Sequence, residues 1–159
     1  MSSLDKSIDS KFNSLKMAIE SEKGKWVSAQ GVNAFIVVYP PQKEKEYLQR
    51  AREHFTGEYI IDISQLFVEL GDYWGVEDFK KLYKNFRSTP RYVFADKNSE
   101  ELDLLKLILR EIKKADEEKK MPILVRTGIL YGTGIRNKMI LEHKQVDKLD
   151  DPLIIFYPG

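Results

Sequence analysis

Residues 121–137 read MPILVRTGILYGTGIRN, and this stretch decides the fold class that the sequence predicts. It begins with a short apolar run over residues 121–125, continues into a glycine-rich loop and then enters a helical pattern. A continuous apolar run of this length is typical of a strand that is covered on both faces. A buried strand followed by a loop and a helix is the repeating unit of proteins built on a parallel sheet.

Three more short apolar runs of this kind occur at residues 34–39, 59–63 and 153–157. Helical patterns precede the first run and separate the others, with apolar residues at every third or fourth position. Together they predict an α/β domain with three layers, in which a mostly parallel sheet of about four strands carries helices on both faces. We expect one domain over residues 1–159, and its N-terminal amphipathic helix, residues 1–24, either packs on the sheet or docks on a partner.

Glycine, proline and capping residues predict where the other helices begin and end. A break over residues 71–75 separates two helices, and Pro90 ends the second, because proline cannot donate a helical hydrogen bond. Asn98 with Glu101 three residues later predicts a capping-box start for the next helix. A single helix is expected after the glycine-rich loop, as far as Val146.

The composition excludes several classes of protein. Hydrophobic residues make up 42% and charged residues 32%, which is typical of a globular domain, and the net charge of +1 gives no general attraction to nucleic acid or anionic membranes. The absence of cysteine excludes thiol catalysis and thiolate metal sites, and His54 and His143 are too few for a multi-histidine centre. The polar N-terminus and the lack of a long apolar run predict a cytoplasmic protein without a membrane segment. We expect neither a metal nor a cofactor, because no complete metal-ligand or nucleotide-binding motif is present.

The glycine-rich loop over residues 127–137 is the candidate ligand site. Ligands of open α/β sheets collect beyond the carboxyl ends of the strands, where glycines let a phosphate approach the backbone and an arginine adds charge-assisted hydrogen bonds. The loop lacks the lysine of a P-loop and the third glycine of a dinucleotide-binding motif, so the glycines alternatively only turn the chain. The candidate ligand-binding residues are Thr127, Gly128, Gly132, Gly134, Arg136 and Asn137.

Two other polar motifs do not amount to a catalytic site. Asp62, inside the second apolar run, is either a metal or catalytic carboxylate or an end-of-strand residue that caps the following helix or pairs with an arginine. Glu142 and His143 are adjacent on a predicted helix, so their side chains do not face one another as an acid–base pair needs. We therefore expect no enzyme.

Aromatic side chains gather in the middle third of the sequence, between Lys and Arg residues. This combination can bind single-stranded nucleic acid by stacking and charge neutralisation. It is also typical of a core or of a protein-binding surface whose lysines point to water, and the neutral overall charge favours this interpretation. The candidate interaction residues are Tyr73, Trp74, Phe79 and Tyr83.

The C-terminal third resembles the BrxB family of bacteriophage-exclusion (BREX) systems. The resemblance lies in the run from Pro122 to Gly128, in Tyr131, in Ile135-Arg136 and in the segment from Pro152 to Gly159. The early run that ends at Tyr39-Pro40 also fits the family. The loop departs from the family pattern, because it is about one residue shorter and lacks the usual Gly-Ser, the proline before Ile-Arg and the histidine beyond the arginine.

The resemblance implies a small cytoplasmic component of antiviral defence, or phage resistance, with no established catalytic residues. Such a protein acts as an adaptor for larger partners, namely the PglZ-type alkaline-phosphatase-like protein and the large AAA-type ATPase of the same system. It would contact nucleic acid only weakly or indirectly. Because the family continues beyond the Pro-Gly pair, we expect a further segment after Gly159. The alternative function is a nucleotide- or phosphate-binding domain that uses residues 127–137.

Overall fold

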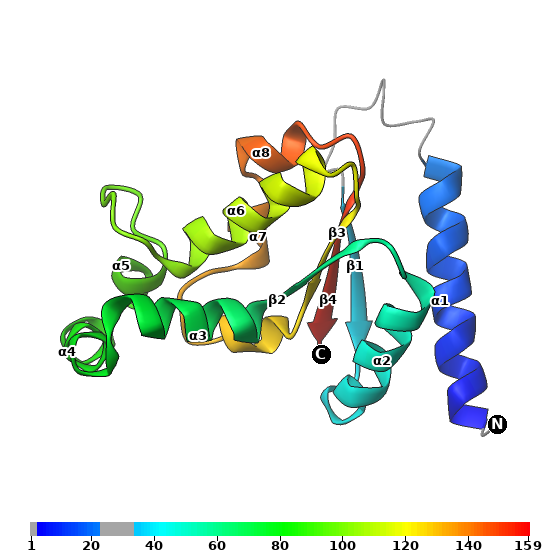
Figure 1. The fold of residues 1–159 in the computed structure, drawn as a ribbon. Coiled ribbons are helices and arrows are strands. Elements are labelled where there is room, and N and C mark those ends of the chain that lie inside the picture. The colour runs from blue at the N-terminus through cyan, green and yellow to red at the C-terminus, as the bar shows by residue number, and fades with distance from the viewer. Residues whose placement is uncertain (1–2, 23–33) are drawn as a thin grey trace.

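The computed structural model describes residues 3–22 and 34–159, and it has the predicted α/β architecture (Figure 1). The strands of the described chain form one sheet in the order β1-β4-β3-β2, and every pair in it is parallel. β4 and β3 are therefore the central strands. The strands are β1 (Ala34–Tyr39), β2 (Tyr59–Asp62), β3 (Pro122–Val125) and β4 (Leu153–Pro158).

Alternate residues of each strand point to opposite faces of the sheet, and each face has its own core. On β3, Ile123 and Val125 belong to one core and Leu124 belongs to the other. The register aligns Ile123 with Ile154 and Leu124 with Ile155, so neighbouring strands send matching residues to the same face. The sheet is thus the middle of three layers.

The first face is covered by α1 (Ser3–Glu22) and α2 (Glu44–His54), which lie on the right of the sheet in Figure 1. Phe12 of α1 stacks on Phe156 of β4, with ring centroids 5.5 Å apart. Phe12 also contacts Phe55, just beyond α2. The N-terminal helix therefore packs on the sheet, which settles the alternative left open by the sequence. The predicted stop at Gly24 lies outside the described residues.

The second face is covered by helices that follow β2 and β3. The main ones are α3 (Ile63–Trp74) and α6 (Leu104–Glu117), which pack on each other and, through α6, on β2 and β3. The smaller α7 (Asn137–Leu141) and α8 (Lys144–Asp147) complete this layer. No described helix is both long and apolar enough to cross a lipid bilayer.

The α3–α5 region extends away from the sheet on the left of Figure 1. It contains α4 (Val76–Phe86) and a short helix, α5 (Arg91–Phe94), which the sequence did not predict. The predicted break at residues 71–75 begins too early, because α3 continues through Gly71 to Trp74. The chain turns at Gly75, whose φ of +78° is a conformation that glycine adopts without strain.

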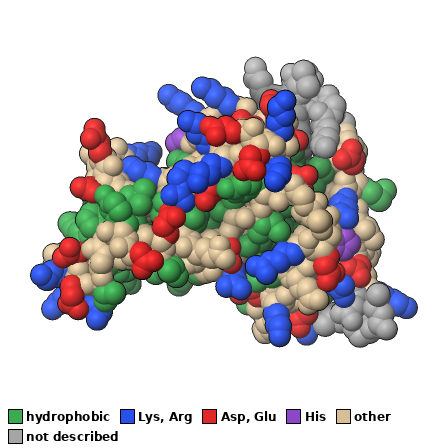
Figure 2. Space-filling model, viewed as in Figure 1, with side chains coloured by type: hydrophobic (Ala, Val, Ile, Leu, Met, Phe, Trp, Pro, Cys, Tyr) green, Lys and Arg blue, Asp and Glu red, His purple; other side chains and the backbone are tan. Residues whose placement is uncertain are grey.

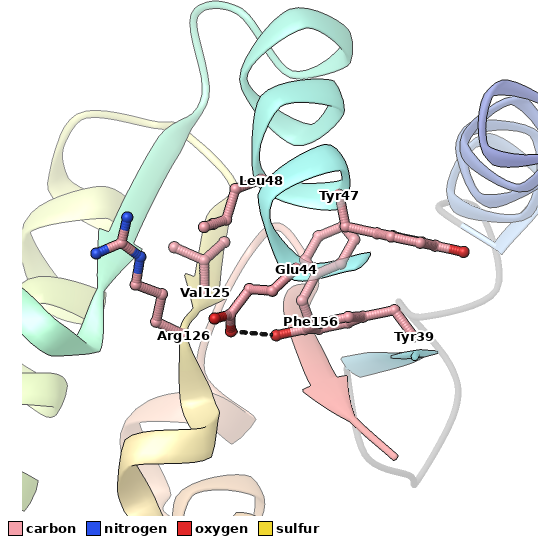
Figure 3. Close-up of a pocket in the computed structure, with 7 residues that line it drawn as sticks. All are labelled: Tyr39, Glu44, Tyr47, Leu48, Val125, Arg126 and Phe156. Carbon is pink, nitrogen blue, oxygen red and sulfur yellow. Dashed lines mark hydrogen bonds between the residues drawn. The ribbon is translucent and has the colours of Figure 1, made fainter. Parts of the chain in front are cut away.

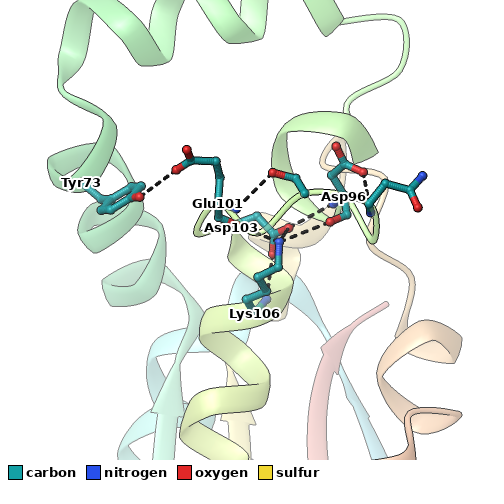
Figure 4. A network of polar contacts seen from close by, with 7 residues as sticks. Tyr73, Asp96, Glu101, Asp103 and Lys106 are labelled. Carbon is teal, nitrogen blue, oxygen red and sulfur yellow. Dashed lines mark hydrogen bonds and ion pairs between the residues drawn. The ribbon is translucent and has the colours of Figure 1, made fainter.

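The predicted start of α6 at Asn98 is wrong. The N-cap is Asp103, whose carboxylate accepts hydrogen bonds from the backbone N–H of Lys106 at 2.8 Å and of Asp96 at 3.0 Å (Figure 4). The Lys106 ammonium lies 3.0 Å from the same carboxylate and also donates to the carbonyl of Glu101. Asp103 rather than Asn98 caps α6 because its side chain is buried and accepts hydrogen bonds from several donors, whereas Asn98 lies in an exposed turn.

The single helix expected after the glycine-rich loop is also wrong. The chain forms α7 and α8 instead, and His143 between them has extended backbone, with φ −70° and ψ 141°. Its imidazole Nδ1 accepts a hydrogen bond from the backbone N–H of Gln145 at 3.2 Å. This cap starts a new helix where the apolar spacing alone suggested a continuous one.

Candidate functional site

The sheet topology selects one position for a ligand. The connection after β1, a 3₁₀ turn (Pro41–Lys43) followed by α2, passes to one face of the sheet. The connection after β3, a second 3₁₀ turn (Thr127–Leu130), passes to the opposite face. The carboxyl end of β4 lies between these two connections. In open parallel sheets the crevice at such a switch point is the usual ligand site.

A hollow of about 610 Å³ opens at this switch point, and its size is typical of a small-molecule site. The loop after β3 forms most of its wall, and Pro41, Tyr157 and Pro158 complete it from the ends of β1 and β4. The structure therefore brings every residue of the candidate ligand site to one place. These residues are Thr127, Gly128, Gly132, Gly134, Arg136 and Asn137.

The threonines of the loop hold its shape. The Thr127 hydroxyl is buried and donates to the carbonyl of Phe156 at 2.6 Å, which ties the start of the loop to β4. The Thr133 hydroxyl donates to the carbonyl of Leu130 at 2.6 Å and accepts from the backbone N–H of Ile135. Both hydroxyls are thus engaged within the protein. Thr127 lines the hollow but is positioned to support the loop rather than to contact a ligand.

Gly134 is required by its surroundings. Its φ is +81°, and a Cβ at this position would lie 3.0 Å from the backbone nitrogen of Arg91. Any side chain here would push the loop away from the start of α5. The interpretation that the glycines turn the chain and allow close packing therefore holds at Gly134, without excluding a ligand on the open side of the loop.

Positive charge gathers on one side of the hollow. Among the described residues that line it, Arg136 is the only charged one. A second hollow, of about 570 Å³, adjoins the first at Gly134 and Arg136 and is also lined by Arg91, Lys138 and Glu142. The Glu142 carboxylate lies 3.7 Å from the Lys138 ammonium and offsets one of these charges. The two arginines leave the boundary between the hollows cationic.

Asp62 is a structural residue. Its carboxylate accepts from the backbone N–H of Ser64 at 2.9 Å and from the Ser64 hydroxyl at 2.6 Å, which caps α3. The Arg126 guanidinium lies 3.7 Å from the other carboxylate oxygen and donates to the Ser64 hydroxyl. Capping and pairing with arginine, the two structural roles considered for Asp62, are therefore both present.

A smaller space on the opposite face of the sheet also has a structural character (Figure 3). The Tyr39 hydroxyl donates to the Glu44 carboxylate at 2.6 Å, and burial with this hydrogen bond raises the pKa of Tyr39 well above its ordinary range. Figure 3 shows the Arg126 side chain pointing away from this pair. The space between the residues is too small to hold a ligand. This contact fastens the end of β1 to the start of α2.

Neither histidine forms a catalytic pair. His54 stacks on Phe12 with centroids 4.9 Å apart, and its Nε2 lies 3.0 Å from the Asp9 carboxylate. His143 caps α8, and burial, followed by the nearby Lys97 ammonium, lowers its pKa. No group of three His, Asp or Glu side chains within residues 3–22 and 34–159 is arranged to hold a metal ion.

The four interaction candidates divide into two groups. Tyr73 and Tyr83 are exposed, and the Tyr73 hydroxyl donates to the Glu101 carboxylate at 2.8 Å (Figure 4). Trp74 and Phe79 are partly buried against the core and act first as packing residues. Figure 2 shows hydrophobic side chains gathered over this end of the molecule, next to α5.

Helix α4 is incompletely covered. None of its residues is buried, although its apolar side chains face α3 and α5. A hollow of about 330 Å³ lies on one side, lined by Phe79, Tyr83 and their neighbours, and one of about 240 Å³ lies on the other, beside Leu82 and Phe86. The aromatic residues that the sequence assigned either to a core or to a binding surface are therefore partly packed against the core and partly exposed.

Two kinds of residue were not predicted from the sequence. The walls contributed by Pro41 and Tyr157 could have been found, because each stands where a strand ends and the carboxyl ends of parallel strands meet at one edge. The exposure of Ile36 and Val38 could not. Strand β1 was expected to be covered on both faces, but it is an edge strand and these side chains are 48% and 54% exposed.

Comparisons of this chain with known proteins found no match. No protein-family model matches the chain, and neither a curated protein nor a solved structure matches it. The resemblance to the BrxB family consequently remains an interpretation of the sequence motifs.

Proposed function

We propose that this chain is a non-enzymatic adaptor of a BREX-type antiviral complex and that it binds a protein partner through its α3–α5 region. The observation that carries the proposal is α4, an amphipathic helix without a buried residue and with an aromatic-lined hollow on each side. A helix of this kind is stabilised when a partner covers its apolar side chains.

The exposed aromatic residues supply the contacts that such a surface needs. Tyr83, Phe86 and Tyr92 are each more than one-third exposed, and Tyr and Phe are enriched in the cores of protein interfaces. Lysines 80, 81 and 84 lie on the same helix and form a polar rim with Glu77 and Asp78. Since this helix carries acidic residues in its first turn as well as lysines further along, the surface fits a folded protein better than the uniformly negative backbone of nucleic acid.

The partners we propose come from the resemblance to BrxB. They are the PglZ-type alkaline-phosphatase-like protein and the large AAA-type ATPase of the same system, with the complex assembling in the cytoplasm. Two features of the described residues support a role without catalysis: Asp62 is occupied in capping α3, and His54 and His143 are occupied in structural contacts.

Co-purification tests this proposal. A tagged chain, co-expressed with the two partners, is expected to retain at least one of them across a series of salt concentrations, because an aromatic interface is only weakly screened by salt. The double variant Tyr83→Asp/Phe86→Asp should lose the partner, while Met17→Asp should keep it, since Met17 is an apolar residue of α1 that is even more exposed than Tyr83 and Phe86. Failure of the unaltered chain to retain either partner, or equal retention by both variants, would overturn the proposal.

A further inference from the structure

The hollow at the switch point of the sheet lies mostly apart from the proposed adaptor surface. It is lined by the loop after β3 and by the ends of β1 and β4, and it meets the adaptor surface only at Tyr131 and Gly132, which also line the smaller hollow beside α4. This hollow of about 610 Å³ lies at the position where parallel sheets usually bind ligands, so it is a candidate ligand site separate from the contact with a protein partner.

The hollow offers aromatic and apolar surface to a planar group. Leu130 and Ile135 are buried beneath it, and two tyrosines stand at its edge. The Tyr131 side chain is 95% exposed and that of Tyr157 is 42% exposed. A large aromatic ring that is almost completely exposed gains little from folding, but it provides a face on which a nucleobase can stack.

The hollow also offers an anion site beside this apolar surface. Arg136 makes no ion pair within residues 3–22 and 34–159, and it stands at the boundary with the second hollow, where Arg91 is a further cation. A guanidinium matches the oxygens of a phosphate with paired hydrogen bonds. The half-buried Asn137 beside it supplies an amide that can donate and accept.

We propose that this hollow binds a nucleoside phosphate. The base lies against Tyr131 and Tyr157, and the phosphate lies at Arg136, on the side of Arg91. The chain has no P-loop lysine, and among the described residues the wall of the hollow carries no carboxylate to hold Mg²⁺. The Glu142 carboxylate of the adjoining hollow lies 3.7 Å from the Lys138 ammonium, so we expect binding without hydrolysis. The ligand therefore serves as a signal or as an assembly factor rather than as a substrate.

Titration calorimetry of the whole chain tests this inference with adenosine and guanosine mono- and triphosphates as probes. Ribose 5-phosphate, inorganic phosphate and the free nucleosides separate the contributions of base and phosphate. We expect saturable binding of at least one nucleotide, with each fragment bound about tenfold or more weakly, because neither alone makes both sets of contacts.

Matched variants locate the site. Arg136→Gln should weaken nucleotide binding about tenfold or more, since it removes a charge-assisted pair of hydrogen bonds, and Tyr131→Ala should weaken binding of the nucleotide but not of inorganic phosphate. Arg52→Gln is the control, because Arg52 is an exposed arginine on α2, on the opposite face. All three positions are exposed, and thermal unfolding verifies that each variant is folded.

Several results would overturn the inference. These are silent titrations with every nucleotide, equal loss in the Arg136→Gln and Arg52→Gln variants, and inorganic phosphate binding as tightly as the nucleotides. Binding of single-stranded oligonucleotides without binding of mononucleotides would also overturn it, in favour of a nucleic-acid surface. Partner retention by the Tyr83→Asp/Phe86→Asp variant is measured separately, so this inference and the adaptor proposal can fail independently.

Discussion

Helices α4 and α6 carry the same kind of amphipathic pattern, but α6 is buried in the core and α4 is not. α6 lies between the sheet and the neighbouring helices, where it contacts β2, β3, α3 and α8. α4 lies beyond α3 and contacts chiefly α3 and α5, and none of its residues is buried. The buried residues of α6 are Leu104, Leu105, Leu107, Ile108, Leu109, Ile112 and Ala115.

The two helix starts differ in the same way. α6 is capped by the buried carboxylate of Asp103, whereas α4 begins after Gly75, which has no side chain to cap it. Helix α6 is thus secured by burial and by local hydrogen bonds, and α4 has little of either. The comparison teaches that an apolar stripe predicts a helix but does not say what covers the stripe. A stripe left open within a folded chain is where a partner is to be sought.

The largest predicted effect on stability is for a substitution on the buried side of α6. Ile108→Ala should lower the free energy of unfolding by about 2–5 kcal/mol, because Ile108 is fully buried and its truncation leaves a cavity as well as losing apolar contacts. Denaturant unfolding followed by circular dichroism measures the change. A loss below about 1 kcal/mol would show that α6 is not the centre of this core.

The cap of α6 comes next. Asp103→Ala should destabilise the protein by about 2 kcal/mol, because it leaves the backbone N–H groups of Lys106 and Asp96 without their acceptor and the Lys106 ammonium without its ion pair. Asp103→Asn is the matched control, since its amide oxygen still accepts from Lys106, and it should cost less. Equal losses in the two variants would mean that the backbone cap contributes little.

The apolar stripe of α4 should contribute much less to the free energy of unfolding than the buried side of α6. Tyr83→Ala should change the free energy of unfolding by less than about 1 kcal/mol, because Tyr83 is 45% exposed and loses little on truncation. The same variant should weaken retention of the protein partner. Destabilisation comparable to that of Ile108→Ala would assign α4 to the core and remove the reason to regard it as a binding surface.

The smallest effect concerns α8, which packs against α6. Burial lowers the pKa of His143 below its ordinary value of 6.5, so the folded state favours neutral imidazole. The associated stability is present above pH 6.5 and is lost as the pH falls through the lowered pKa, since protonation costs more in the folded state than in the unfolded state. The unfolding midpoint should therefore fall on acidification, and less so in His143→Gln. The same acid dependence in both proteins would assign it to other groups.

Much of the fold could be predicted because it depends on local spacing. The four strands appear close to their predicted positions, and the helices on both faces of the sheet were expected from the alternating pattern. The errors lie where a tertiary contact decides. Asp103 rather than Asn98 begins α6 because it is the residue that is buried beside Asp96 and Lys106, and His143 divides the last helical segment by capping α8.

The candidate ligand site shows the same division. Residues 127–137 could be selected from their glycines and their place after a strand, and the structure brings all six named residues to one hollow. The contribution of Tyr157 follows from strand order, and the second arginine, Arg91, arrives from a short helix that the sequence did not predict. Among the interaction candidates, spacing alone could not separate exposed Tyr83 from half-buried Phe79.

The sequence by itself determined the helices and strands, the α/β class and the glycine-rich candidate loop over residues 127–137, because these depend on neighbours within a few residues of each other. Only the tertiary structure decided which apolar stripe is covered, that β1 lies at the edge of the sheet, and that the ends of β1, β3 and β4 enclose a hollow. The physical reason is that burial is set by residues distant along the chain. Ile36 and Ile123 look alike in sequence, yet one is about half exposed and the other is completely buried.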